Sequence, residues 1–359
     1  MTIRWPDMAA EAPEPDLLGV LPHWLAPLLE QLLGQREALH HGLMLAGPAG
    51  IGKSILGRHL AAGLLCETDL PSRPGGQACL QCQSCQWMQQ LAHPDLRLIM
   101  PEALDPLFVG SGSKKPSREI KIDQVRMLSA FMAVGAHRAG WRIVIVDPAE
   151  AMNPITANGL LKTLEEPGAR TLLILPVSHA DRLPATVRSR CRVVPVNNPP
   201  TEAAAQWLVE HGAESLDTAR RVLRAAGSPM HALQFIEPAE QAAHQSILEA
   251  LGALPDTAGM KAVDLLDRHD PMQWSGVLQR WISDLTRVVA GASAHYYPQA
   301  QARMQQLAPR TSLAKLTTLQ VSVSTLSARI DHPLNARLLC ESTILDYCQT
   351  FAAERSERR

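Results

Sequence analysis

The chain has 359 residues, of which 46% are hydrophobic and 19% are charged, a composition typical of a folded globular protein and not of a disordered one. A chain of this length provides for about two or three domains. The formal net charge is −1, so the overall charge gives no attraction to nucleic acid or to anionic membranes, and any DNA contact has to be local or shared with partners.

The cellular compartment is the next property that the sequence bears on. No apolar run reaches the roughly 18 residues that span a bilayer, and the first residues, MTIRWPDMAAEAPEPD, lack the basic-then-apolar order of a signal peptide. We therefore expect a cytoplasmic protein without a membrane segment. Disulfides are rare in that compartment, so the seven cysteines predict another use of thiol groups.

Helical and strand-like patterns alternate in the first half of the chain. Apolar spacing predicts helices, and short buried runs predict strands. The expected helices are 22–33, 53–65, 122–132 and 156–166, and the expected strands are 42–46, 95–100, 141–147 and 170–175. Residues 105–117 have the Gly, Ser and Lys content of a mobile loop. This alternation predicts an α/β domain with a parallel sheet.

The strands end at VVPVNNPP, residues 193–200, where the double proline indicates a domain boundary. Only helical patterns follow. Between 274 and 289 the apolar residues form one stripe, which is typical of a core or of a surface that packs against a partner. The stripe consists of Trp274, Val277, Leu278, Trp281, Ile282, Leu285 and Val288. The second half is therefore expected to be a helical bundle.

A glycine-rich loop stands between the first strand and the helix after it. Its sequence, GPAGIGKS at 47–54, satisfies G-x-x-x-x-G-K-[ST] without a mismatch. Gly47, Gly50 and Gly52 let backbone N–H groups approach phosphate oxygens, Lys53 reaches the β- and γ-phosphates, and Ser54 can hold Mg²⁺. The flanking strand and helix make a chance glycine turn the weaker interpretation, so the loop predicts nucleotide binding.

Asp147 ends the strand expected at 141–147, where an acidic residue can bind Mg²⁺ through water. In hydrolysing proteins of the P-loop class an adjacent glutamate orients the attacking water, but here the adjacent residue is Pro148. Glu150 lies three residues beyond Asp147. We therefore expect ATP or ADP with Mg²⁺ to bind without rapid hydrolysis.

Four cysteines are grouped between residues 66 and 90. Cys66, Cys79, Cys82 and Cys85 read C-x₁₂-C-x₂-C-x₂-C, a spacing that fits a closed tetrahedral Zn²⁺ site with a structural role. An iron–sulfur cluster and simple free thiols are the alternatives. His93 is near in sequence, but its segment favours the start of a strand over a ligand.

Residues 188–192, RSRCR, gather three arginines. One interpretation is a solvated basic edge. The other is an arginine finger, a guanidinium that neutralises charge on the γ-phosphate held by another subunit. Spacing in the sequence does not choose between them.

Four stretches in order, GPAGIGKS, the cysteine insertion, NGLLKTLEEP and LPATVRSRC, resemble bacterial clamp-loader subunits of the AAA+ class. In that family the cysteine insertion is specific to the γ/τ and δ′ types of DNA polymerase III subunit. Two departures from γ/τ are usual for δ′: Pro148 after Asp147, and Met230 where γ/τ has a nucleotide-sensing arginine. The resemblance is close over residues 20–235 and looser beyond.

The resemblance implies a three-part architecture. It consists of an α/β P-loop (AAA+) domain at 1–197 with a zinc module at 66–90, a small helical lid domain at 198–239, and a helical collar domain at 240–359 for assembly. It also implies a non-hydrolysing subunit of the DNA polymerase III holoenzyme that helps to load the sliding clamp on primed DNA. Its partners would be γ/τ and δ subunits, and Arg190 would be an arginine finger for a neighbouring γ/τ site.

Three other functions remain open at this point. The first is an ATPase motor of the γ/τ type, with Glu150 as the base. The second is a nucleoside monophosphate kinase, which can pair a glycine loop with a four-cysteine zinc lid, although its cysteines lie further from the loop. The third is a zinc-dependent nucleic-acid-binding module, against which the near-neutral charge argues.

Overall fold

The computed structural model describes residues 17–105, 116–133, 136–137, 140–256, 259–326 and 336–352. The chain divides into two compact units, Met1–Pro199 and Pro200–Arg359. Almost all of the loop expected at 105–117 lies outside the described residues. Within the described ranges, no helix combines the length and the apolar character that crossing a membrane requires.

The first unit contains a five-stranded sheet in which every strand pairing is parallel. The strands are β1 (Gly42–Ala46), β2 (Leu96–Ile99), β3 (Arg142–Val146), β4 (Thr171–Val177) and β5 (Arg192–Pro195), and their order across the sheet is β2-β3-β4-β1-β5. The parallel α/β fold expected from the sequence is confirmed. The fifth strand begins just before the segment that we interpreted as a boundary.

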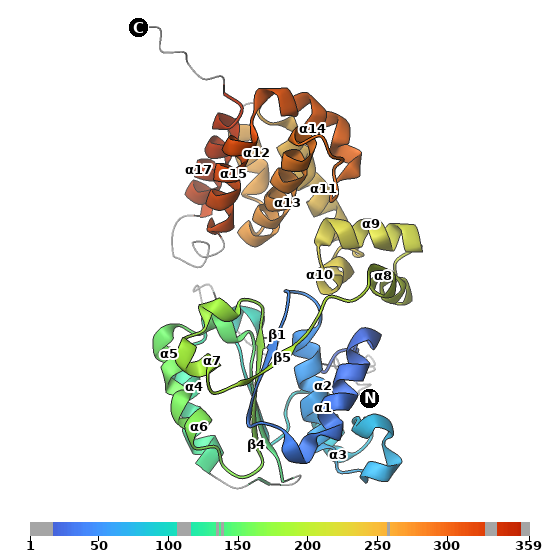
Figure 1. Cartoon of the computed structure of the whole chain (residues 1–359), viewed down its shortest axis with the longest axis vertical. Coiled ribbons are helices and arrows are strands. Elements are labelled where there is room, and N and C mark those ends of the chain that lie inside the picture. Colours follow the sequence, from blue (N-terminus) through green and yellow to red (C-terminus); the bar gives the residue numbers. More distant parts are fainter. Residues whose placement is uncertain are drawn as a thin grey trace, which may run out of the picture. The chain divides into compact units, whose positions relative to one another are not determined.

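Helices cover both faces of this sheet, because alternate strand residues point to opposite sides. Leu43 and Leu45 of β1 join the core on the side of α1 (Ala26–Gly34), α2 (Lys53–Leu65) and α3 (Gln83–Gln89). Met44 joins the core on the other side (Figure 1), formed by α4 (Ile122–Ala133), α5 (Pro154–Gly159), α6 (Leu161–Glu165) and α7 (Ala185–Arg188). The single helix predicted at 156–166 is split after Gly159, a poor helix former.

The described part of the second unit is built from helices, as predicted. They are α8 (Thr201–Glu210), α9 (Leu216–Ala226), α10 (Pro229–Gln234), α11 (Pro238–Ala253), α12 (Gly259–Leu266), α13 (Pro271–Val289), α14 (Gln301–Leu307), α15 (Leu313–Ser324) and α17 (Ala336–Gln349). A division of this unit into a lid and a collar stays a prediction.

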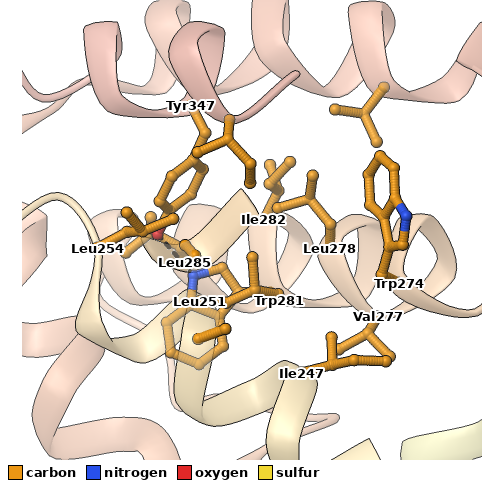
Figure 2. Close-up of a cluster of buried hydrophobic side chains, with 14 of the residues drawn as sticks. Ile247, Leu251, Leu254, Trp274, Val277, Leu278, Trp281, Ile282, Leu285 and Tyr347 are labelled. Atoms are coloured by element: carbon orange, nitrogen blue, oxygen red, sulfur yellow. Dashed lines mark hydrogen bonds between the residues drawn. The ribbon is translucent and has the colours of Figure 1, made fainter. Parts of the chain in front are cut away.

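The core of the second unit is centred on α13. Six members of the predicted apolar stripe are buried, and Val288 is partly buried against the same cluster. Figure 2 shows Trp274 and Trp281 among aliphatic side chains of this cluster. The indole N–H of Trp281 donates to the Tyr347 hydroxyl at 2.8 Å, so the large ring is buried without an unpaired polar atom. The stripe is therefore core.

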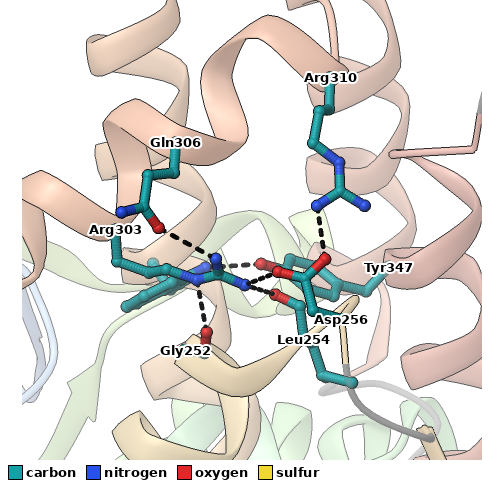
Figure 3. A network of polar contacts seen from close by, with 8 residues as sticks. Gly252, Leu254, Asp256, Arg303, Gln306, Arg310 and Tyr347 are labelled. Atoms are coloured by element: carbon teal, nitrogen blue, oxygen red, sulfur yellow. Dashed lines mark hydrogen bonds and ion pairs between the residues drawn. The ribbon is translucent and has the colours of Figure 1, made fainter.

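A polar network fastens the end of α11 to α14 (Figure 3). Arg303 donates to the carbonyl oxygens of Gly252 at 2.7 Å and Leu254 at 3.0 Å, and to Asp256 at 2.7 Å. Arg310 donates to the other oxygen of Asp256 at 2.6 Å. Carbonyls at a helix C-terminus lack partners within the helix, so the guanidinium of Arg303 stabilises this end of α11.

Candidate nucleotide and metal sites

The glycine-rich loop connects β1 to α2 and packs tightly against the chain. A Cβ on Gly47 would lie 2.0 Å from the Val196 carbonyl oxygen, so a larger residue does not fit. Gly50 and Gly52 have positive φ values of 71° and 98°, a conformation that favours glycine. Gly52 immediately precedes the first turn of α2, whose backbone N–H groups are the usual partners of a phosphate.

Lys53 is held in place by groups at the carboxyl ends of two strands. Its Nζ donates to the carbonyl oxygens of Gly47 at 2.9 Å and Pro48 at 2.6 Å, and to the Ser178 hydroxyl at 3.0 Å. Burial lowers the pKa of the Lys53 ammonium, while neighbouring carboxylates act in the opposite direction. The positive charge therefore lies beside the loop in a fixed orientation.

Ser54 and Asp147 lie 93 residues apart in the sequence and meet in the structure. The Ser54 hydroxyl donates to Asp147 Oδ1 at 2.9 Å. Asp147 directly follows β3 and is only 7% exposed. Burial raises the pKa of its carboxyl group, and the hydrogen bond from Ser54 opposes that rise. A hydroxyl and a carboxylate in contact are suitable ligands for Mg²⁺, directly or through water.

Ser178 and Glu150 complete the polar groups around Lys53, and the sequence analysis missed Ser178. The backbone N–H of Ser178 donates to Glu150 Oε1 at 2.8 Å. Within the described residues, Glu150 Oε2 is buried and has no hydrogen-bond partner. Ser178 directly follows β4, and polar residues at the carboxyl ends of neighbouring parallel strands meet at one edge of the sheet. Its position just after a predicted strand was the sequence feature from which Ser178 could have been predicted as a site residue.

The four predicted cysteine ligands come together in one cluster. Their Sγ atoms all lie within 4.8 Å of one another. The sulfurs of Cys66 and Cys82 are 3.9 Å apart, and those of Cys79 and Cys85 are 3.8 Å apart. A tetrahedral shell with Zn–S bonds of about 2.3 Å places sulfurs about 3.8 Å apart, so the donor set fits a zinc ion.

Hydrogen bonds around Cys79 favour the form of sulfur that binds metals. Backbone N–H groups of Gln81 and Cys82 donate to its Sγ at 3.4 Å and 3.3 Å. Desolvation raises the pKa of Cys79, but these bonds and one from Thr68 outweigh it and lower the pKa to about 6. A lowered thiol pKa favours the thiolate.

His93 lies outside the cysteine cluster, as the sequence analysis favoured. Its Nδ1 accepts from the backbone N–H of Asp95 at 3.0 Å, and its Nε2 lies 3.1 Å from the Ser84 hydroxyl. One ring nitrogen is thus engaged by the residue that precedes β2, and the other by a serine of α3. Among the described residues, the cluster of possible metal ligands consists of the four cysteines and does not include His93.

Arg190 differs from the two other arginines of the RSRCR segment. It follows α7, and its Nη2 lies 2.6 Å from Glu165 Oε1 at the end of α6. Its Nη1 donates to the Thr186 carbonyl oxygen at 2.9 Å. Arg188 and Arg192 are exposed and form no ion pair within the described ranges. Within the described residues, Arg190 therefore differs from its two neighbours in being held by an ion pair.

Comparisons with known proteins point to one family. Residues 25–200 match the family model described as DNA polymerase III, delta subunit. The chain is similar to DNA polymerase III subunit delta′ of Pseudomonas aeruginosa, with 38% identity over 213 residues, 58% of this chain and 59% of that protein. Similarity to the delta′ subunit of Escherichia coli is 33% over 231 residues, 64% of each chain.

The similarity extends at a lower level to a second type of subunit. DNA polymerase III subunit tau of Salmonella typhimurium is 27% identical over 237 residues, which cover 63% of this chain and 34% of that protein. The matched stretches span less than two thirds of the length of the two delta′ relatives. The match to the family model, over residues 25–200, includes the glycine-rich loop, the cysteine cluster and Arg190.

Proposed function

We propose that the chain is a non-hydrolysing stator, a delta′-type clamp-loader subunit of the AAA+ class. Its similarity to two delta′ subunits and, at a lower level, to a tau subunit supports this proposal, as does the match of residues 25–200 to the DNA polymerase III delta subunit family. In this role it assembles with gamma/tau and delta subunits in the cytoplasm and helps to load the sliding clamp on primed DNA. The observation that carries the proposal is a nucleotide cradle whose expected base is replaced by Pro148.

The cradle is proposed to hold ATP or ADP with Mg²⁺ as a structural ligand. Backbone N–H groups of the glycine-rich loop and of the first turn of α2 would bind the phosphates, with Lys53 as the counter-charge. Ser54 and Asp147, already in contact at 2.9 Å, would hold the metal ion. A preformed lysine and a preformed metal-binding pair reduce the ordering that binding requires.

Hydrolysis also needs a general base, and the acidic residue that follows Asp147 most closely in the sequence, Glu150, already has another partner. Glu150 accepts the Ser178 backbone N–H with one carboxylate oxygen and so supports the end of β4. A positioned general base contributes about 10²- to 10⁴-fold to a rate, and Pro148 has no group for this task. We therefore expect the isolated chain to bind nucleotide and to turn it over slowly.

The four-cysteine cluster is proposed to hold one structural Zn²⁺. Its sulfurs have the mutual distances that a tetrahedral shell requires. A shell of four protein thiolates leaves no open position for a substrate, so the ion would stabilise the segment between α2 and β2. This part of the proposal is independent of the nucleotide cradle.

Arg190 is proposed to act in trans on a nucleotide held by a neighbouring gamma/tau subunit. A guanidinium is always charged, and its planar fork of N–H donors matches phosphate oxygens. Its side chain is 37% exposed, so the group is accessible from outside this unit's core. The stator would thereby complete an active site that it does not itself contain.

Reconstituted clamp loader tests this proposal. Arg190→Ala should leave assembly intact and reduce clamp- and DNA-stimulated ATP hydrolysis by the complex at least about tenfold, since trans-acting arginines contribute about 10³- to 10⁵-fold at their own site. Arg188→Ala and Arg192→Ala are the matched controls and should hydrolyse ATP normally. Equal rates for all three variants and the parent would contradict the proposed role.

A second candidate function, a gamma/tau-like ATPase motor, is favoured by one observation. Glu150 Oε2 is buried, has no hydrogen-bond partner within the described residues, and its charge acts on both Lys53 and Asp147. Turnover of about 1 s⁻¹ by the purified chain, abolished by Glu150→Gln, would favour the motor over the stator.

A further inference from the structure

Arg190 makes three polar contacts with groups of its own unit. Glu165 Oε1 lies 2.6 Å from Nη2, the Thr186 carbonyl oxygen accepts from Nη1 at 2.9 Å, and the Ser189 hydroxyl lies 3.4 Å from Nη1. Thr186 and Ser189 belong to α7 and its C-cap, whereas Glu165 is the last residue of α6. The contact with Glu165 is thus the one that joins the arginine to a second element.

These contacts use some of the N–H donors of the guanidinium and leave others. The two terminal nitrogens make the contacts, whereas Nε takes part in none of them, and a guanidinium has more N–H donors than the contacts use. The side chains of Arg190 and Glu165 are 37% and 49% exposed. A partly exposed guanidinium held through its terminal nitrogens can therefore still meet a phosphate with its remaining donors.

We propose that Glu165 is a positioning residue that holds the Arg190 fork in the orientation in which a neighbouring subunit's nucleotide meets it. The inference rests on the trans-acting role proposed for Arg190 and adds the residue that orients it. If the arginine side chain is already held in its active orientation, the entropy cost of ordering it does not add to the barrier for hydrolysis. Glu165 would thus act on hydrolysis through Arg190, without contact to the nucleotide.

The size of the expected effect follows from the exposure of the pair. Exposed ion pairs are weak, so losing this one should change a rate by at most about fivefold. The sign of the change separates two possibilities. A carboxylate that orients the arginine accelerates hydrolysis, whereas one that withholds it from the phosphate slows hydrolysis.

The neighbouring residue provides a matched control. Glu166 is exposed, forms no ion pair within the described residues, and carries the same charge one position further along the chain. In reconstituted clamp loader, Glu165→Gln should lower kcat for ATP about two- to fivefold, with KM for ATP unchanged. Glu166→Gln should behave like the parent, and Glu165→Asp should restore part of the rate, because the charge remains.

A double variant shows whether Glu165 acts through Arg190. Glu165→Gln combined with Arg190→Ala should be no slower than Arg190→Ala alone. An unchanged or raised kcat for Glu165→Gln, while Arg190→Ala is slow, would overturn the positioning role and leave the trans-acting arginine standing. Normal hydrolysis by Arg190→Ala itself would instead remove the proposed function on which this inference depends.

Discussion

Two buried aspartates, one from each unit, have different surroundings: Asp284 in the helical unit and Asp147 in the α/β unit. Asp284, on α13 of the helical unit, is fully buried and accepts backbone N–H groups from His295 and Tyr297, both at 2.7 Å. Within the described residues, the carboxylate of Asp147, after β3 of the α/β unit, accepts one hydrogen bond, from the Ser54 hydroxyl. Burial raises the pKa of Asp147, a sign that its surroundings do not fully replace water.

This difference in hydrogen bonding indicates a structural role for Asp284 and a ligand-binding role for Asp147. Asp284 is fully buried, and each of its oxygens accepts a backbone N–H from one turn of the chain, so the carboxylate has a structural use. Asp147 keeps acceptor capacity at the carboxyl edge of a parallel sheet, where ligands of such folds bind. The cysteine cluster is also arranged for a ligand, since its four Sγ atoms lie within 4.8 Å of one another, and the backbone N–H groups that contact Cys66 and Cys79 stabilise the thiolate form.

The largest effect is expected in the cysteine cluster. Cys82→Ser should abolish stoichiometric zinc in the purified chain and unfold the segment between α2 and β2, because metal-binding energy is also folding energy there. Elemental analysis and protease protection of this segment measure the outcome. Cys348→Ser, in the helical unit, is the control and should keep the metal. If the parent protein instead contained iron and absorbed visible light, the cluster would be an iron–sulfur site and the zinc assignment would be wrong.

The next effect concerns Asp284. Asp284→Asn replaces one acceptor oxygen by an amide N–H₂ and leaves a buried backbone donor without a partner, which should cost about 1–3 kcal/mol of unfolding free energy. Denaturant unfolding measures this loss, and nucleotide binding should be unchanged. A variant as stable as the parent would show that the turn at 295–297 does not depend on the carboxylate.

The smallest effect on stability is expected at Asp147. Its pKa is raised in the folded protein, so its contribution to stability is complete below the unfolded pKa and is lost as pH rises through the folded pKa. At neutral pH, Asp147→Asn should therefore leave Tm equal or slightly higher, while Mg²⁺-dependent nucleotide affinity falls. In thermal unfolding between pH 4 and pH 8, the Tm of the parent should fall relative to the Tm of the variant as pH rises. A clear drop in Tm for the variant would place Asp147 with Asp284 as a structural group.

Much of the α/β unit was predictable because its signals are local. The run 42–46 is a strand with the expected bounds, and α2 begins at Lys53 and ends at Leu65 as expected. The four cysteines were grouped correctly because two-residue spacings already place thiols close together. The split between α5 and α6 was missed, since helical periodicity continues through Gly159.

The sequence by itself determined the parallel α/β class, the helical second half, the glycine-rich loop and the cysteine set, because propensity, periodicity and short spacings act over neighbouring residues. Only the tertiary structure decided that Ser54 meets Asp147, that Ser178 holds Lys53, and that Glu165 pairs with Arg190. These contacts join side chains at the ends of different strands and helices. Their meeting depends on strand order and on the packing of α6 against α7, which no local pattern encodes.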